Sequence, residues 1–348
     1  MPGLVLHSAC VRVSAEASTH IIASCTERKR APIPAGLHLG SLADGVPLVR
    51  ARQWWDRLNA HDGARQPAND LYGGEHWTLA QRSLNVFSGA GIEADLWIAS
   101  AGYGLIPASA PLCPYSATFA QGVPDSVTRG LLEARARPAT LQAWWACLGE
   151  FPGPEARESR SLQALAARSP RSALLVVASP DYIRAMRLDL LAARDALKTP
   201  ERLIVISNRD LSSDAELSRH LIPVDERCRT VLGGTMQGLN ARVALSLLEW
   251  GHAEPLSVPR LRQRYDDMVS DAEKPPKPNR ERMDDKDVVA FLRAELAKDP
   301  RAGWTLLLRT LRGGGRACEQ RRFKELHQQV RDELPRGSQH GLKLDQDS

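Results

Sequence analysis

Tyrosines and a carboxylate follow one apolar run of the chain at a spacing that suits a ligand pocket. Residues 100–106 read Ser-Ala-Gly-Tyr-Gly-Leu-Ile, so Tyr103 stands between two glycines, and Tyr115 follows nearby. Asp125 and Ser126 come next, in a glycine-containing loop. Because strands of parallel sheets end in such loops where a pocket forms, this pattern predicts a site for a flat polar ligand such as a nucleobase. Asp125 is the leading candidate for a general base, with a helix cap as its alternative role.

The loop after the first apolar run is dense in hydrogen-bonding groups. Cys25, Thr26, Glu27 and Lys29 lie within five residues of one another. The carboxylate of Glu27 could orient a water, and Lys29 could contact a phosphate. An ordinary polar loop is the alternative, in which Cys25 is a small packing residue.

A third group is Asp-Leu-Tyr-Gly-Gly-Glu-His-Trp at residues 70–77. Its two glycines let the backbone approach a ligand, and Tyr72 can stack on one. Glu75 and His76 resemble an acid/base pair, but neighbouring residues of a helix point apart. The start of a helix is therefore an equally good interpretation.

Two further polar groups stand late in the apolar half of the chain. Asn208 follows an apolar run, and a Gly-Gly-Thr segment ending in Thr235 leads into a helical pattern that also carries Gln237, Asn240 and Arg242. Backbone N–H groups at a helix start attract anions. The segment matches neither the Walker motif nor the dinucleotide fingerprint, so no nucleoside triphosphate or NAD cofactor is predicted.

The elements that position these residues alternate between strands and helices. Continuous apolar runs, typical of strands covered on both faces, occupy 19–24, 94–99, 172–178, 202–207 and, more weakly, 219–224. Helical patterns occupy 79–90, 141–148, 181–197 and 239–250. This alternation predicts an α/β fold with a mostly parallel sheet flanked by helices.

Composition and charge divide the chain further. It has 348 residues, of which 43% are hydrophobic, and six cysteines without a CxxC pair, which argues against a zinc site or a disulfide scaffold. Residues 274–331 hold 15 Lys/Arg and 8 Asp/Glu, a balance of +7, whereas residues 1–273 hold 29 of each sign. No apolar run reaches membrane length and no secretory signal is recognisable, so we expect a reduced, cytoplasmic protein with no membrane contact.

The basic segment has the pattern of a small helical module. Amphipathic helices are predicted at 287–296, 304–311 and 318–334, with Gly-Gly-Gly between the last two. Such a set fits a helix-turn-helix-like unit, although any small helical bundle shows similar spacing. Arg316, Arg321, Arg322 and Lys324 would meet a DNA backbone; a solvated basic face is the alternative.

We expect four parts: an α/β catalytic domain at 1–255, a proline-rich linker at 256–283, the basic helical DNA-binding module at 284–334, and a disordered tail at 335–348.

The loop at 25–29, residues 70–73, residues 100–106, Tyr115 and Asp125 together resemble a bacterial family of domains related to the YaaA proteins and to uracil-DNA-glycosylase-like folds. With the basic module, the chain is similar to those members that remove glucosylated hydroxymethylcytosine from phage DNA. The resemblance covers roughly residues 19–250. Uracil-DNA glycosylases carry Gly-Gln-Asp-Pro-Tyr after the first strand and His-Pro-Ser after the last core strand; here these places read Cys-Thr-Glu-Arg and Ser-Asn-Arg.

The resemblance implies a DNA glycosylase that flips a modified base out of double-stranded phage DNA and hydrolyses its N-glycosidic bond, in anti-phage defence, without metal or cofactor. Asp125 or Glu27 would stabilise the cationic sugar, with Asn208 as a third catalytic residue. The residues implied to bind base or sugar are Cys25, Thr26, Asp70, Tyr72, Tyr103, Tyr115, Ser126 and Gln237. Those implied to bind the DNA backbone are Lys29, Thr235, Asn240, Arg242, Arg316, Arg321, Arg322 and Lys324.

Two alternatives remain, a non-catalytic DNA-binding stress protein and a base-exchange transferase for a deazapurine. The sequence does not indicate an oligomeric state.

Overall fold

The structure, a computed structural model, describes residues 18–131, 133–155, 158–250, 256–275 and 279–333. It divides into two units, Met1–Pro275 and Pro276–Ser348, each with its own hydrophobic core. The tail predicted at 335–348 lies outside the described residues. None of the helices in the described ranges combines the length and apolar character that crossing a membrane requires.

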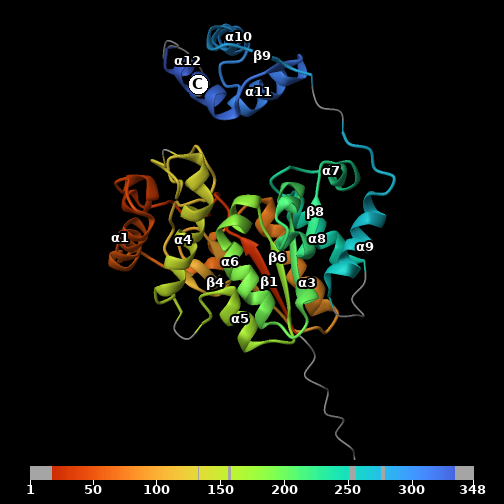
Figure 1. Cartoon of the computed structure of the whole chain (residues 1–348). Coiled ribbons are helices and arrows are strands. Elements are labelled where there is room, and N and C mark those ends of the chain that lie inside the picture. The colour runs from red at the N-terminus through yellow and green to blue at the C-terminus, as the bar shows by residue number, and fades with distance from the viewer. Residues whose placement is uncertain (1–17, 132, 156–157, 251–255, 276–278, 334–348) are drawn as a thin grey trace, which may run out of the picture. The chain divides into compact units, whose positions relative to one another are not determined.

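A six-stranded sheet forms the centre of the first unit (Figure 1). Its strands, in spatial order, are β4 (Gly104–Pro107), β3 (Ala94–Ser100), β1 (Thr19–Ser24), β6 (Ala173–Val177), β7 (Leu203–Asn208) and β8 (Leu221–Val224). All pairs are parallel except β3 with β4, which form an antiparallel hairpin at one edge. The predicted α/β fold with a mostly parallel sheet is confirmed, and each of the five apolar runs is a strand.

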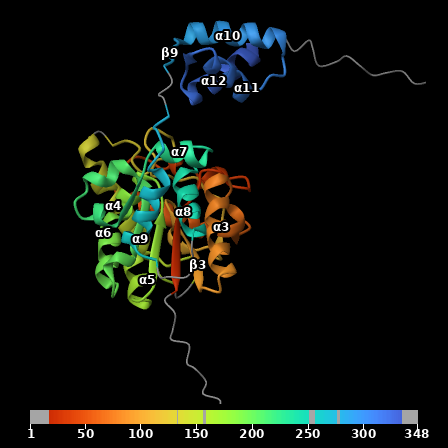
Figure 2. The ribbon, with the colours of Figure 1, turned by 90° about the vertical axis from the view of Figure 1, so that its right-hand side faces the viewer.

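Helices cover both faces of this sheet, as Figure 2 shows. One layer contains α4 (Arg137–Glu150), α5 (Leu162–Arg168) and α6 (Pro180–Ala196), with α1 (Pro47–Ala60) against α4. The other contains α3 (Glu75–Gly89) and α8 (Leu239–Glu249), while α7 (Arg227–Leu232) and α9 (Val258–Val269) pack near β8. Short elements complete the unit: α2 (Ala68–Leu71), the pair β2 (Gln66–Pro67) and β5 (Pro111–Leu112), and single 3-10 turns at Ala35–Leu37, Leu39–Ser41, Ala134–Ala136, Pro200–Arg202, Arg209–Ser213 and Leu217–His220.

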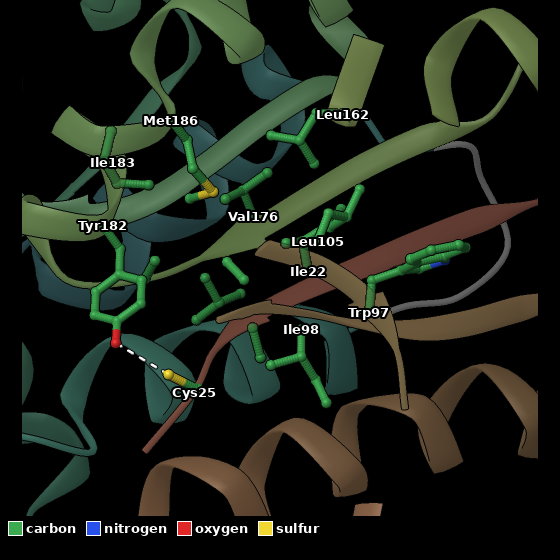
Figure 3. Close-up of a cluster of buried hydrophobic side chains, with 14 of the residues drawn as sticks. Ile22, Cys25, Trp97, Ile98, Leu105, Leu162, Val176, Tyr182, Ile183 and Met186 are labelled. Atoms are coloured by element: carbon green, nitrogen blue, oxygen red, sulfur yellow. Dashed lines mark hydrogen bonds between the residues drawn. The ribbon is translucent and has the colours of Figure 1, made fainter. Parts of the chain in front are cut away.

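The core lies between the sheet and its helices because the central strands are apolar on both faces. Ile22 of β1 pairs in register with Trp97 of β3 and with Val176 of β6, and all three are buried. Figure 3 shows these side chains beneath Ile183 and Met186 of α6. Full burial of such a side chain stabilises the fold by about 1.5–3 kcal/mol, so this cluster fixes the strand ends that carry the site.

The predicted linker at 256–283 is wrong over its first half, because that segment contains α9. Leu261, Tyr265 and Val269 recur every four residues along α9 and are at most 1% exposed within the core of the first unit. The Tyr265 hydroxyl donates to the carbonyl oxygen of Pro223, at 2.8 Å. The first unit therefore extends beyond residue 255, and the division between the units falls between Pro275 and Pro276.

The second unit contains the three predicted helices, α10 (Asp285–Lys298), α11 (Trp304–Gly313) and α12 (Gln320–Glu333). Their apolar faces meet in a small core around Leu292, Leu308 and Phe323. The glycine turn leads into a short parallel pair, β9 (Glu281–Arg282) with β10 (Arg316–Ala317). Gly315 adopts a φ of 75°, which explains the preference for glycine there.

Candidate active site at the carboxyl edge of the sheet

A cleft of about 970 Å³ opens where the direction of the chain reverses across the sheet. From β1 the chain proceeds to β3 on one side, whereas from β6 it proceeds to β7 and β8 on the other. Ligands of open α/β sheets bind at such a switch point, outside the carboxyl ends of the strands. The lining comes from the loops after four strands and from three helix starts: Ser24, Cys25, Thr26, Arg28, Gly73, Gly74, Glu75, His76, Thr118, Ala120, Ser179, Pro180, Tyr182, Asn208, Arg209, Asp210, Val224, Asp225, Glu226, Thr235, Met236, Gln237, Gly238, Leu239, Asn240 and Lys274.

Three helices begin at this cleft. Glu75 opens α3, Pro180 opens α6 and Leu239 opens α8, and all three residues line the cleft. The N-terminal end of a helix carries a partial positive charge and unpaired N–H groups. Convergence of three such ends on one cavity favours an anionic ligand.

His76 and Ser24 form a polar contact in the lining of the cleft. The Nε2 atom of His76 lies 3.3 Å from the Ser24 hydroxyl oxygen, which joins the start of α3 to the end of β1. Burial lowers the pKa of His76 to about 4. The imidazole is therefore neutral at physiological pH and can donate one hydrogen bond without carrying charge.

The four carboxylates of the lining differ in their partners. Glu75 forms an ion pair with Arg242 and accepts a hydrogen bond from the Thr235 hydroxyl, so it closes the rim between α3 and α8. Asp225 pairs with Arg209 and Arg227, at 2.8 and 3.1 Å. Although burial opposes ionisation, the hydrogen bonds and charge of Arg227 hold the pKa of Asp225 below its usual value.

The carboxylates of Asp210 and Glu226, in contrast, have no hydrogen-bond or ion-pair partner within the described residues. Asp210 directly follows β7 and its first turn residue, and its backbone N–H donates to the Asn208 side-chain oxygen at 2.9 Å. A free carboxylate on an anchored backbone is available for a ligand. Asp210 is therefore the best placed candidate for charge stabilisation in the cleft.

Six of the predicted site residues come together in this cleft: Cys25, Thr26, Asn208, Thr235, Gln237 and Asn240. The Cys25 sulfur lies 3.0 Å from the Tyr182 hydroxyl, as the dashed line in Figure 3 marks. The Thr26 hydroxyl donates to the carbonyl oxygen of Gly73, at 2.8 Å, and ties the first loop to the start of α3. Cys25, Thr26 and Asn208 were predictable because carboxyl ends of parallel strands meet at one edge, and the other three because their segment leads into a helix.

The predicted stacking tyrosines lie beneath the site rather than in it. Tyr72, Tyr103 and Tyr115 are at most 1% exposed. The hydroxyls of Tyr72 and Tyr115 are 2.9 Å apart, and Tyr115 also lies 2.6 Å from the Ser100 hydroxyl. Burial raises the pKa of all three phenols. Because the three rings are buried, they cannot stack on a ligand in this structure.

Lys29 and Glu27 are also outside the lining. The Lys29 ammonium lies 4.8 Å from the centre of the Tyr115 ring and donates to the Thr26 carbonyl oxygen. Burial lowers its pKa. Its predicted contact with a phosphate is not supported by this orientation, and Glu27 is exposed and does not line the cleft.

Asp125, the leading predicted catalytic residue, joins two loops of the first unit and does not act as the helix cap that was its alternative role. Its carboxylate accepts a hydrogen bond from the Gly40 backbone N–H at 2.8 Å and lies 3.1 Å from the His38 ring nitrogen. A Cβ at Gly40 would lie only 2.9 Å from that carboxylate, so the two loops are in close contact. Ser126 is buried and bonded to Thr128. Neither residue lines the cleft.

Two other predicted residues are elsewhere. Asp70 is exposed and lines a separate hollow near the start of β3, together with Asp95. The Arg242 guanidinium forms an ion pair with Glu75 and donates a hydrogen bond to the carbonyl oxygen of Gly233, at 2.9 Å. It supports the loop before α8 and is not free for a DNA backbone.

The basic residues of the second unit are only partly free. Arg322 forms ion pairs with Asp285 and Glu325, and Arg321 pairs with Glu325. Lys324 lies 5.9 Å above the Trp304 ring. Arg316 is exposed and has no ion-pair partner within the described residues, so it remains the best placed of the four for a phosphate.

Sequence reasoning missed Asp210, Asp225 and Ser24, which all line the cleft. Their signal was position alone: Ser24 ends a predicted strand, Asp225 directly follows one, and Asp210 comes three residues after the end of another. Within the described ranges no cluster of histidine, cysteine or carboxylate side chains could hold a metal ion. Comparison with known proteins finds no matching family, no similar curated protein and no similar solved structure.

Proposed function

We propose that the chain is a DNA glycosylase that hydrolyses the N-glycosidic bond of a modified base, with glucosylated hydroxymethylcytosine in phage DNA as the first substrate to test. The observation that carries the proposal is the polar cleft at the switch point, whose lining includes neutral His76 and free Asp210. Its volume of about 970 Å³ is at the upper end of ordinary ligand pockets. A flipped base with a bulky adduct would therefore fit.

The chemistry of the lining suits this reaction. As the bond between C1′ and the base nitrogen breaks, positive charge develops on the sugar and negative charge on the base. The carboxylate of Asp210 would stabilise the sugar and take a proton from the attacking water, whose hydroxide joins C1′. The neutral imidazole of His76 would donate a hydrogen bond to the departing base, which finally gains the proton.

Two observations support a nucleic-acid ligand. The convergent starts of α3, α6 and α8 favour an anion at the cleft. Residues 274–331, which include most of the described part of the second unit, have a net charge of +7. The exposed side chains of this unit include Arg282 and Arg316. Such a surface attracts a phosphate backbone with an affinity that falls as salt rises.

The test is the formation of abasic sites. Hypermodified and unmodified phage DNA are incubated with the protein and treated with alkali, which breaks strands at abasic sites. We expect breaks in modified DNA only, with Asp210→Asn slower by about 10²–10³-fold. Glu226→Gln, which removes the other free carboxylate of the cleft, is the matched control for the loss of one negative charge and should slow excision less than Asp210→Asn. Binding without breaks would contradict the proposal and favour a non-catalytic DNA-binding protein.

A further inference from the structure

The side-chain amide of Asn240 has one fixed orientation. Its Nδ2 atom donates to the carbonyl oxygen of Ala178, at 3.0 Å. A carbonyl oxygen accepts hydrogen bonds and cannot donate one, so the nitrogen of the amide must face Ala178. The Ser207 hydroxyl donates to the same oxygen at 2.7 Å, which holds this acceptor in place at the end of β6.

The other end of the amide is therefore presented as an acceptor. Asn240 lines the cleft, and its Oδ1 atom has no hydrogen-bond partner within the described residues. Thr26 adds a second acceptor, because its proton is directed to the carbonyl oxygens of Gly73 and Arg28. The free carboxylates of Asp210 and Glu226 can only accept as well.

A cleft that presents hydrogen-bond acceptors from several elements suits a ligand group that has more than one hydrogen-bond donor. An exocyclic amino group of a nucleobase carries two N–H donors, whereas the keto group in the same position of the deaminated base carries none. Asn208 complements this arrangement: its oxygen accepts from the Asp210 N–H, so its Nδ2 atom is available to donate to a ring nitrogen beside the amino group.

We propose that Asn240 is a specificity-determining residue that accepts a hydrogen bond from the exocyclic amino group of the bound base, so that amino bases are accepted and their keto analogues rejected. A keto oxygen opposite Oδ1 would leave two acceptors without a proton, and an unsatisfied buried polar group costs about 1–3 kcal/mol. The inference rests on the proposed function only in taking the ligand to be a nucleobase.

The experiment compares bases that differ only by this group. Binding of 2′-deoxycytidine against 2′-deoxyuridine, and of 2′-deoxyadenosine against 2′-deoxyinosine, is measured by NMR titration of the full chain. We expect the amino member of at least one pair to bind roughly tenfold more tightly. In Asn240→Leu this preference should fall to within about twofold. Gln81→Leu, which removes an amide of α3 outside the cleft, should retain it.

The outcomes separate the inference from the proposed function. Equal binding, a keto preference, absence of nucleoside binding, or a folded Asn240→Leu that retains the preference would overturn the inference. If Asn240→Leu does not fold, the comparison of amino and keto nucleosides in the unaltered chain still tests the inference. Excision of a keto base would overturn the inference and leave the glycosylase proposal intact. A preference for amino bases without formation of abasic sites would support the inference and contradict the glycosylase proposal.

Discussion

The Nε2 atom of His76 and the hydroxyl of Ser24 lie 3.3 Å apart, at the point where α3 begins and β1 ends. This contact brings together two segments that are separated by about fifty residues of sequence. Because burial lowers the pKa of His76 to about 4, the imidazole is neutral at physiological pH, and in the proposed reaction it would donate to the leaving base.

The pH dependence of excision should reflect this neutral histidine. Between pH 5.5 and 8 the rate should show no step near 6.5, the ordinary histidine pKa, because His76 stays unprotonated throughout. His76→Gln should lower the rate by about 10²-fold, whereas His61→Ala, a histidine after α1, should not. A rate that rises or falls around pH 6.5 in the unaltered chain and not in His76→Gln would contradict the assignment.

Folding stability should depend on the protonation of His76 below pH 6.5. Its pKa is lower in the folded chain than in the unfolded chain, so the unfolded chain binds the proton first as the pH falls. Stability should therefore decrease from pH 6.5 to about 4, by about 1–3 kcal/mol, and level off below. Chemical denaturation at several pH values measures this. A folded His76→Gln variant whose free energy of unfolding falls equally steeply between pH 6.5 and about 4 would contradict this prediction.

Asp125→Asn should affect stability and leave catalysis intact. Burial opposes ionisation of this carboxyl group, but hydrogen bonds from Ser116, Gly40 and His38 hold its pKa below the ordinary value. Its contribution to stability is therefore present at neutral pH and lost as the pH falls through the folded-state pKa. At pH 7 we expect Asp125→Asn to lower the free energy of unfolding by about 1–2 kcal/mol, with a difference that narrows in acid.

The control for that variant is Asp56→Asn, an exposed carboxylate of α1. Excision per folded molecule should be unchanged in both variants. Loss of excision in a fully folded Asp125→Asn would return this residue to the active site.

The basic module should bind DNA through cations that have no acidic partner. Arg282 and Arg316 are exposed and form no ion pair within the described residues, whereas Arg321 and Arg322 are held by acidic neighbours. Replacing Arg282 and Arg316 with alanine should make the slope of log K against log salt shallower by about two. The matched double change at Arg321 and Arg322 should alter it by less than one. The reverse order would identify the start of α12 as the contact.

The sheet was predictable from sequence because its strands are continuously apolar. Of the six gathered site residues, Cys25, Thr26 and Asn208 followed from their positions at the ends of strands, and Thr235, Gln237 and Asn240 from the Gly-Gly-Thr segment before a helix. β4 was missed because it has four residues and follows a tight turn. α9 was missed because prolines on either side of it are typical of a linker, although Leu261, Tyr265 and Val269 recur at helical spacing.

The errors at the site have one physical origin. Tyr72, Tyr103, Tyr115 and Asp125 stand in loops at the correct edge of the sheet, but their side chains are taken up by partners from other segments. Sequence position indicates which loop a residue occupies. The direction of its side chain depends on hydrogen bonds and packing that form only when distant segments meet.

The most direct test follows the products of modified phage DNA in water enriched in ¹⁸O, by mass spectrometry. The proposal predicts release of the free modified base and one ¹⁸O atom at C1′ of the abasic sugar, because water supplies the hydroxide that replaces the base. DNA that keeps all of its bases in the presence of the folded protein would contradict glycosidic hydrolysis, as would base release only upon addition of a second free base, without ¹⁸O in the sugar.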